Sequence, residues 1–431
     1  MTAYSSVATI AIPARSKEPC TQAADALRRS SVTSPVCMPR VRSPTVIPDQ
    51  LPLGFHATVA NIGVKDTTDD FVVITMDGPA MAAAGVFTQS RFAGPSVVLS
   101  RDHLATGTPR AMVVVSKNAN VANGQEGAAD AERLVATVAD RWGYAPGDIL
   151  LASTGVIGRR YPIDSMVSSI AQLDPGATSH GLRDAARGIM TTDTVEKVAV
   201  ATIGEGPAVV CGIAKGVGMI EPDMATMIAV VMTDAELPVD ELRAIHRRVT
   251  DTTFNCVSVD TDTSTSDTAV LLASGHYPVN PADMERALAD VQRTLTRAIA
   301  ADGEGAETLI EVRVDGARDD HQAKRVAKSI VNSPLVKTAI HGADPNWGRV
   351  AMAIGKCNDH DIDADACVIS FGGVEVYPRK VDDAGLAELE NYLHGPEVMI
   401  EVNLHIDRGT ATVWGCDLTD GYIRINADYT T

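Results

Sequence analysis

The segment Gly212–Asp234 carries the residues of this chain that are best suited to covalent chemistry. Lys215 stands among glycines, and a loop containing Pro222 then leads to Thr226, directly before the apolar run Met227–Met232. Reactive groups are often held on loops above a rigid scaffold, so Thr226 is a candidate nucleophile at which the chain cuts itself. Threonine also suits the start of a buried strand, which is the commoner role for such a short pattern. The local pattern leaves both interpretations open.

Three other loops contain groups that could bind or polarise a substrate. Thr154 and Gly155 follow an apolar run, where a hydroxyl and a backbone N–H could form an oxyanion hole or merely an ordinary glycine turn. Met190–Thr194 clusters hydroxyls beside one carboxylate, which suits either a polar substrate or a capped turn. Glu304 lies between two glycines, free to approach a ligand amine or to stay solvated after a helix end.

Neither a metal site nor a cofactor site is predicted. His341 and Asp344 could bind a metal, but no third ligand has a recognisable spacing, so a structured loop packed by Trp347 is favoured. Asp260–Thr268 is expected to be a functional or packed polar loop between strands. The glycine pairs lack the third glycine of a dinucleotide fingerprint, and the aspartates after Asn358 lack the glycine and terminal glutamate of a calcium loop.

Composition narrows the class of protein and of partner. The chain has 431 residues, of which 45% are hydrophobic and 4% aromatic, and 34 are glycines, as expected for a soluble globular protein of two domains. Its net charge of −18 argues against nucleic acid as a partner. Seven widely spaced cysteines without a C-x-x-C pair fit a reducing, cytoplasmic compartment. No apolar run approaches the roughly 20 residues that span a bilayer, which argues against a membrane partner.

The elements that must position these loops can be read from periodicity. Residues 1–50 are rich in Ser, Pro and Arg and are predicted to be a disordered extension. Short apolar runs rich in β-branched residues predict strands at Phe71–Met76, Ala111–Ser116, Ile149–Ser153, Ala208–Ile213, Met227–Met232, Ala269–Ala273, Leu309–Val314, Val368–Phe371, Met399–Ile406 and Ala411–Trp414. Helical spacing predicts helices over Ala131–Trp142, Leu242–Val249, Met284–Ile299 and Ala384–Leu393. Strands outnumber helices and do not alternate strictly with them, which favours α/β layers over a doubly wound sheet.

With these motifs laid out, the chain resembles the ornithine acetyltransferase (glutamate N-acetyltransferase) family. The resemblance runs from about residue 55 to the C-terminus. The matching pieces are STGVIG at Ser153–Gly158, MTTDT at Met190–Thr194, KGVGMIEPDMAT at Lys215–Thr226, DTDTSTSDTAV at Asp260–Val270, DGEGA at Asp302–Ala306, HGADPNWGRVAMAIGK at His341–Lys356 and GCDLTDGYIRINADYTT at Gly415–Thr431. Six separated motifs in order, followed by the matching C-terminal run, make chance agreement implausible, and they favour the nucleophile interpretation of Thr226.

The resemblance implies self-cleavage between Ala225 and Thr226, giving an α chain of residues 51–225 and a β chain of residues 226–431. Thr226 would then carry acetyl from N2-acetylornithine to L-glutamate in a ping-pong reaction. Its freed α-amine, with a pKa of about 7.7–8.0, can serve as the base for its own hydroxyl, so no histidine is needed. Thr154 and Gly155 match the family's oxyanion stabilisers. The substrate-contacting positions correspond to Thr191, Lys215, Thr226, Glu304, Asn426 and Thr431.

The resemblance also implies a layered α/β sandwich similar to N-terminal nucleophile hydrolases, an α2β2 heterotetramer and no cofactor. Val217 and Asp223 differ from the residues that are commoner in the family at these positions, and this variant is most similar to the family member of clavulanic acid gene clusters. These two differences bear on substrate preference. Two alternatives remain: an N-terminal nucleophile amidase or aminopeptidase that releases the acyl group to water, and an uncleaved binder of acetylated amino acids.

Overall fold

The computed structural model describes residues 49–176, 179–221 and 227–428. Nearly all of the predicted disordered extension, residues 1–50, therefore lies outside the described residues. The predicted cleavage site, Ala225 and Thr226, also lies outside them, as does Thr431.

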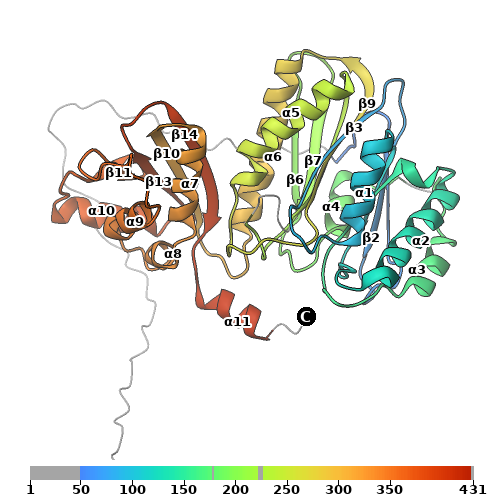
Figure 1. Ribbon diagram of the computed structural model, residues 1–431, viewed down its shortest axis with the longest axis horizontal. Coiled ribbons are helices and arrows are strands. Elements are labelled where there is room, and N and C mark those ends of the chain that lie inside the picture. The colour runs from blue at the N-terminus through green and yellow to red at the C-terminus, as the bar shows by residue number, and fades with distance from the viewer. Residues whose placement is uncertain (1–48, 177–178, 222–226, 429–431) are drawn as a thin grey trace, which may run out of the picture. The chain divides into compact units, whose positions relative to one another are not determined.

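The first sheet contains four strands in the order β1-β2-β4-β5 (Figure 1). Its members are β1 (Phe55–Ala60), β2 (Phe71–Met76), β4 (Ala111–Val115) and β5 (Ile149–Ser153). Strands β4 and β5 are parallel, and helix α2 (Gly124–Trp142) provides the crossover between them. Because α2 buries Leu134 and Val138 against this sheet, its apolar stripe is the one that the sequence predicts.

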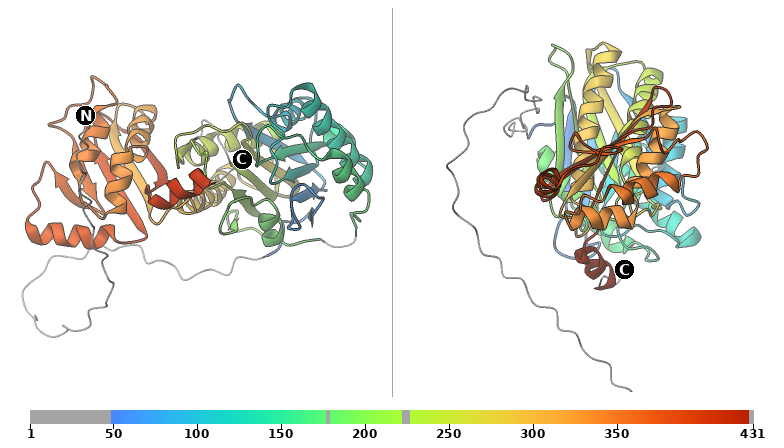
Figure 2. Two further views of the ribbon diagram at one scale, coloured as in Figure 1. Left: turned by 90° about the horizontal axis from the view of Figure 1, so that it is seen from below. Right: turned by 90° about the vertical axis from the view of Figure 1, so that its left-hand side faces the viewer.

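A second sheet has the order β3-β9-β8-β7-β6. Its strands are β3 (Ala82–Phe87), β6 (Lys197–Thr202), β7 (Val209–Lys215), β8 (Ile228–Glu236) and β9 (Thr268–Pro278). Side chains of the two sheets share one core, in which Ile74 and Val114 of the first sheet join Val230 of the second. Helices α5 (Val239–Thr252) and α6 (Pro281–Ala301) pack on the other face of the second sheet. Helices α2 and α3 (Ile163–Ile170) cover the outer face of the first sheet. The predicted layered α/β architecture is confirmed (Figures 1 and 2).

The C-terminal part forms a third sheet, ordered β12-β11-β13-β10-β14. Its strands are β10 (Leu309–Ala317), β11 (Val368–Phe371), β12 (Val374–Tyr377), β13 (Glu397–Asn403) and β14 (Gly409–Cys416). The helices of this part are α7 (Asp320–Val331), α8 (Pro334–His341), α9 (Trp347–Gly355) and α10 (Asp383–Leu393). Helix α7 packs on β10 and β14, which join it in a common apolar core.

The sequence located the central strands well but missed edge strands and short helices. Strands β1, β3, β6 and β12 have no predicted counterpart. Among the helices, those without one are α1 (Pro95–Thr106), α3, α4 (Leu182–Gly188), α7, α8, α9 and α11 (Asp420–Asp428). Strand β3, AAAGVF, illustrates the reason: its alanines have little strand propensity, and pairing with β9 determines its conformation. No helix within the described ranges is long and apolar enough to cross a membrane.

Candidate active site

Thr154 and Gly155 lie where β5 ends, as the sequence predicts. The Thr154 amide donates to the Val115 carbonyl at 3.0 Å, and its buried hydroxyl accepts a hydrogen bond from the Lys215 ammonium at 3.4 Å. Gly155 has φ +127°, and a Cβ there would come within 2.2 Å of the Lys117 carbonyl carbon, so only glycine fits. No described residue accepts a hydrogen bond from the Gly155 N–H. These two donors are therefore available to an oxyanion.

Lys215 is the last residue of β7, directly before the glycine loop, and its side chain is buried. Burial lowers the pKa of its ammonium, and the Asp193 carboxylate, 3.9 Å away, offsets part of this effect. Asp193 also accepts a hydrogen bond from the Gly216 amide at 2.7 Å. One carboxylate thus fixes both the cation and the backbone immediately after it.

A buried ion network holds Asp193 in place. The Lys197 ammonium lies 2.8 Å from Asp193 Oδ1 and 2.5 Å from Asp302 Oδ2, and its side chain is fully buried. Burial raises the pKa of Asp193, but Lys215 and Lys197 outweigh burial and lower it to about 2. Asp193 is therefore ionised at neutral pH. The group contains two cations and two carboxylates, which explains how it tolerates so little solvent.

The loop around Thr191 is a capped turn, one of the two alternatives drawn from its sequence. Asp193 Oδ2 accepts from the Thr191 amide at 3.1 Å, and Asp302 accepts from both the amide and the hydroxyl of Thr194. Asp302 in turn follows the last residue of α6. The turn brings Thr191 into the same ion network as Lys215, but none of these contacts tests whether Thr191 binds substrate.

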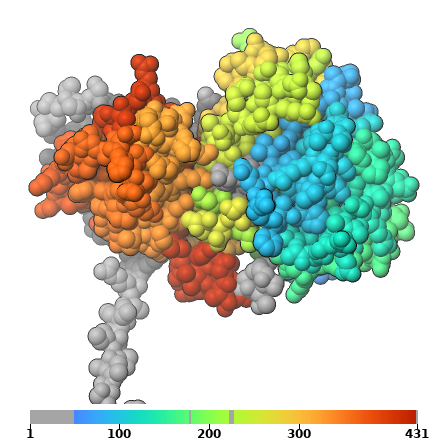
Figure 3. Space-filling model, in the orientation of Figure 1, coloured from blue at the N-terminus to red at the C-terminus, as the bar shows by residue number. Residues whose placement is uncertain are grey.

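Glu304 is positioned against the loop that follows Lys215. Its amide donates to the Val217 carbonyl at 2.8 Å, and a Cβ on Gly218 would lie 2.6 Å from the Glu304 carboxyl carbon. Asn426 of α11 donates to Glu304 Oε2 at 2.9 Å, across 122 positions of the chain. The family resemblance implied that both residues contact the substrate, and the structure shows their side chains in direct contact. In the space-filling view α11 lies on the surface (Figure 3), and none of its residues is buried.

Helix α11 is attached to the Glu304 loop through Gly305. The Thr419 hydroxyl donates to the Gly305 carbonyl at 2.6 Å. Gly305 has φ +70°, and a Cβ there would come within 2.3 Å of the Tyr422 amide nitrogen. A glycine is therefore required for the C-terminal helix to dock beside Glu304.

The described residue nearest to the predicted cleavage site on the β-chain side is Met227. Its amide donates to Asp267 Oδ1 at 2.8 Å, and its carbonyl accepts from the Thr268 amide at 3.0 Å. On the other side, Asp260 accepts hydrogen bonds from the Met219 and Ile220 amides at 2.6 and 2.8 Å. The polar run Asp260–Thr268 therefore anchors both ends of the segment that contains Ala225 and Thr226, which confirms a structured polar loop.

Sequence reasoning missed Lys197, Asp302 and Asp267 as parts of this site. For Lys197 a signal existed, because a lysine in the apolar run KVAVAT is unexpected on a buried strand unless a carboxylate pairs with it. Asp302 and Asp267 belong to motifs that the sequence singles out, DGEGA and TSTSD, but nothing local distinguishes them from solvated acids.

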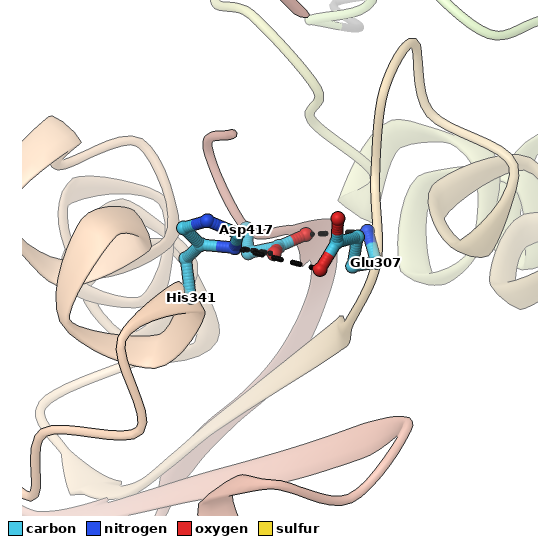
Figure 4. A group of neighbouring side chains, drawn as sticks. All are labelled: Glu307, His341 and Asp417. Carbon is cyan, nitrogen blue, oxygen red and sulfur yellow. Dashed lines mark hydrogen bonds and ion pairs between the residues drawn. The ribbon is translucent and has the colours of Figure 1, made fainter. Parts of the chain in front are cut away.

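His341 has two partners that its sequence neighbourhood does not contain. Its Nδ1 lies 3.1 Å from Asp417 Oδ2 and 3.8 Å from Glu307 Oε2, and the three side chains converge from separate segments (Figure 4). Asp344, the partner considered from sequence, instead accepts from Asn346 at 3.2 Å. Asp417 Oδ1 accepts the Glu307 and Thr308 amides at 2.9 and 3.0 Å. These contacts give the group a structural role, because they join the end of α8 to the residues that lead into β10.

Trp347 stacks on Tyr377 with ring centroids 4.9 Å apart, which agrees with the predicted structured loop packed by this tryptophan.

Two sequence comparisons with known proteins agree with each other. A family model described as the ArgJ family matches residues 56–431. Arginine biosynthesis bifunctional protein ArgJ 2 of Nostoc sp. is 53% identical over 382 residues, covering 88% of this chain and 98% of the relative. Glutamate N-acetyltransferase Oat2 of Streptomyces clavuligerus is 53% identical over 388 residues, with the same coverage. Among solved structures, the ArgJ protein of Bacillus halodurans is 42% identical with a TM-score of 0.44, covering 46% of this chain and 98% of that one.

Proposed function

This chain belongs to the ArgJ family, and from that membership and the site's geometry we propose that it is a glutamate N-acetyltransferase. It transfers acetyl from N2-acetylornithine to L-glutamate and releases ornithine and N-acetylglutamate. The transfer proceeds through an acetyl ester on Thr226, after the chain has cut itself between Ala225 and Thr226. The relative from Streptomyces clavuligerus is named for this activity, and 98% of its length aligns with this chain.

The observation that carries the proposal is the contact between Lys215 and Thr154, at 3.4 Å across 61 positions. It joins a candidate carboxylate-binding cation to a candidate oxyanion donor. The same loop places Glu304 against Val217, at the entrance to the segment that leads to Thr226. Motifs that are far apart in the sequence thus meet around the residues that flank the proposed cleavage site.

Each residue has a role that suits its chemistry. The Thr226 α-amine takes the proton from its own hydroxyl, which attacks the acetyl carbonyl. The Thr154 hydroxyl and the Gly155 N–H stabilise the resulting oxyanion. Lys215 binds the substrate α-carboxylate, and Glu304 pairs with the side-chain ammonium of ornithine.

Three further residues complete the substrate contacts. Thr191 contacts the substrate from the turn held by Asp193. Asn426, which donates to Glu304, and Thr431 contribute from the C-terminal tail. No step of this mechanism requires a cofactor or a metal.

The mature protein is proposed to be an α2β2 heterotetramer of chains 51–225 and 226–431, in the cytoplasm.

Chain cleavage tests the nucleophile directly. Wild-type protein on a denaturing gel should show two chains, Thr226→Ala one, and Thr226→Ser, which keeps a hydroxyl, two. A single wild-type chain would contradict both this proposal and the amidase alternative, and would favour the uncleaved binder of acetylated amino acids.

The second measurement separates a transferase from a hydrolase. Ornithine released from N2-acetylornithine is followed with and without glutamate, and the acetyl group is followed into N-acetylglutamate. We expect release to depend on glutamate. Equal release without glutamate, with acetate as the product, would favour the amidase alternative.

A further inference from the structure

A cavity lined by three arginines lies where α1 and α5 pack beside the edge strand β3 (Figure 1). Its volume is about 230 Å³, and the cations are Arg101 of α1 and Arg243 and Arg247 of α5. None of the residues that line it is among those proposed for acetyl transfer. The cavity is therefore a separate feature of the molecule, and its charge needs an explanation of its own.

The three cations have no counter-charge. Within the described ranges none of them forms an ion pair with a carboxylate. Arg101 donates to the Thr88 carbonyl, and Arg243 donates to the Ala83 and Leu104 carbonyls at 3.4 and 3.1 Å. Neutral carbonyl oxygens orient a guanidinium group but leave its positive charge uncompensated.

Arg247 is the least engaged of the three. It is exposed, and it makes neither a hydrogen bond nor an ion pair with any residue that the structure describes. It follows Arg243 by four positions on α5, and like charges at this spacing destabilise a helix. The neighbouring Arg248 shows the usual arrangement, because it pairs with Glu285 at 2.7 Å and with Glu241 at 3.9 Å. The acids of this region therefore compensate Arg248 and leave the cavity positive.

The apolar residues of the cavity leave space between the cations. Gly85 of β3 lines it, and a Cβ there would come within 2.6 Å of a Leu104 methyl carbon and 2.9 Å of the Phe87 ring. The Arg101 guanidinium carbon lies 5.9 Å from the centroid of the Phe87 ring, a contact that favours one position of this cation. A few converging polar groups on an otherwise apolar wall are typical of a ligand site.

We propose that this cavity binds a small multivalent anion that carries a phosphate group or several carboxylates. Guanidinium groups donate paired hydrogen bonds to either kind of group, and they stay charged at physiological pH. The volume of about 230 Å³ lies below that of a pocket for a drug-sized molecule, so a small ion fits best. Nucleic acid is disfavoured, because the net charge of −18 on the chain would repel the rest of a long polyanion.

The test is calorimetric titration of the full-length protein with inorganic pyrophosphate and, separately, with citrate, at constant ionic strength. We expect saturable binding with a Kd of about 1 mM or lower for at least one of the two anions. Binding of pyrophosphate alone would identify a phosphate ligand, and binding of citrate alone a carboxylate ligand. Added sodium chloride should weaken the binding, because it screens charges that are open to solvent.

Arg247→Gln is the diagnostic variant, and Arg248→Gln, next to it on the same helix, is its matched control. Arg247→Gln removes charge-assisted hydrogen bonds to the anion and should weaken binding about 10-fold or more. Arg248→Gln loses an ion pair outside the cavity and should bind like wild type. Arg247 makes no polar contact with a described residue, so its variant should unfold at the wild-type temperature, which separates lost binding from lost folding.

Three results would overturn the proposal. One is the absence of saturable binding by either anion, and another is equal affinity for the two variants. The third is self-association that Arg247→Gln abolishes in sedimentation while neither anion binds, which would assign the cavity to a contact between copies of the chain. None of these measurements follows acetyl transfer or chain cleavage, so the proposed function is tested separately.

Discussion

Replacing Lys197 with methionine tests the buried ion network that underlies the site. Methionine has a similar length and no charge, so Asp193 and Asp302 would lose the cation between them. Breaking a buried pair by removing one partner typically costs about 3–5 kcal/mol, because a buried charge is left uncompensated. The side chains of Lys197 and Asp193 are fully buried, but Lys215 remains 3.9 Å from Asp193 as a second cation. We therefore expect a loss near the lower end of that range, about 3 kcal/mol, in the free energy of unfolding at pH 7.

The pKa of Asp193 gives an independent check on this magnitude. It lies at about 2 in the folded protein and near 3.8 in the unfolded chain, a difference worth about 2 kcal/mol at about 1.4 kcal/mol per pH unit. The folded-state value is the lower one, so this stabilisation is complete above about pH 4 and is lost as the pH falls towards 2. Without Lys197 the pKa of Asp193 rises, and the cost of the substitution should therefore shrink between pH 7 and pH 3.

The measurement is urea unfolding followed by circular dichroism, with Thr226→Ala as the background so that one chain is compared throughout. The matched control is Arg293→Met, which removes a solvent-exposed cation 3.0 Å from Asp290. Exposed pairs contribute about 0–1 kcal/mol, so the control should barely change the midpoint. A Lys197→Met loss below about 1 kcal/mol, or one that does not shrink on acidification, would refute the reasoning.

The remaining predictions concern substrate handling. Thr154→Val removes one proposed oxyanion donor and should lower kcat for ornithine release about 100-fold or more, with an unchanged chain fold by circular dichroism; an unchanged kcat would exclude Thr154 from the oxyanion site. Glu304→Gln keeps the shape of the side chain but loses its charge, and should raise KM for N2-acetylornithine about 10-fold or more. Glu205→Gln, an exposed acid in the β6–β7 turn, is the control, and equal KM values for the two variants would remove Glu304 from the ornithine site.

The sequence determined the local features of this protein. The apolar runs predict the central strands of all three sheets, because alternation and length depend only on neighbouring residues. The loop of Thr154 and Gly155 follows a strand end as expected, and the left-handed backbone at Gly155 accounts for the glycine. Family membership, predicted from the wording of separated motifs, is confirmed by the match over residues 56–431. The roles of Ala225, Thr226 and Thr431 stay predictions, since these residues lie outside the described ranges.

Only the tertiary structure decided which charged groups meet. Lys197 and Asp302 are 105 positions apart, and Asp267 and Met227 are 40 apart, yet each pair is joined directly. His341 pairs with Asp417 rather than with nearby Asp344 for the same reason. Local periodicity specifies which face of an element is buried, whereas a buried charge is stable only if a remote partner is brought to it. That partner is set by how the sheets and loops pack, and no local pattern in the chain records it.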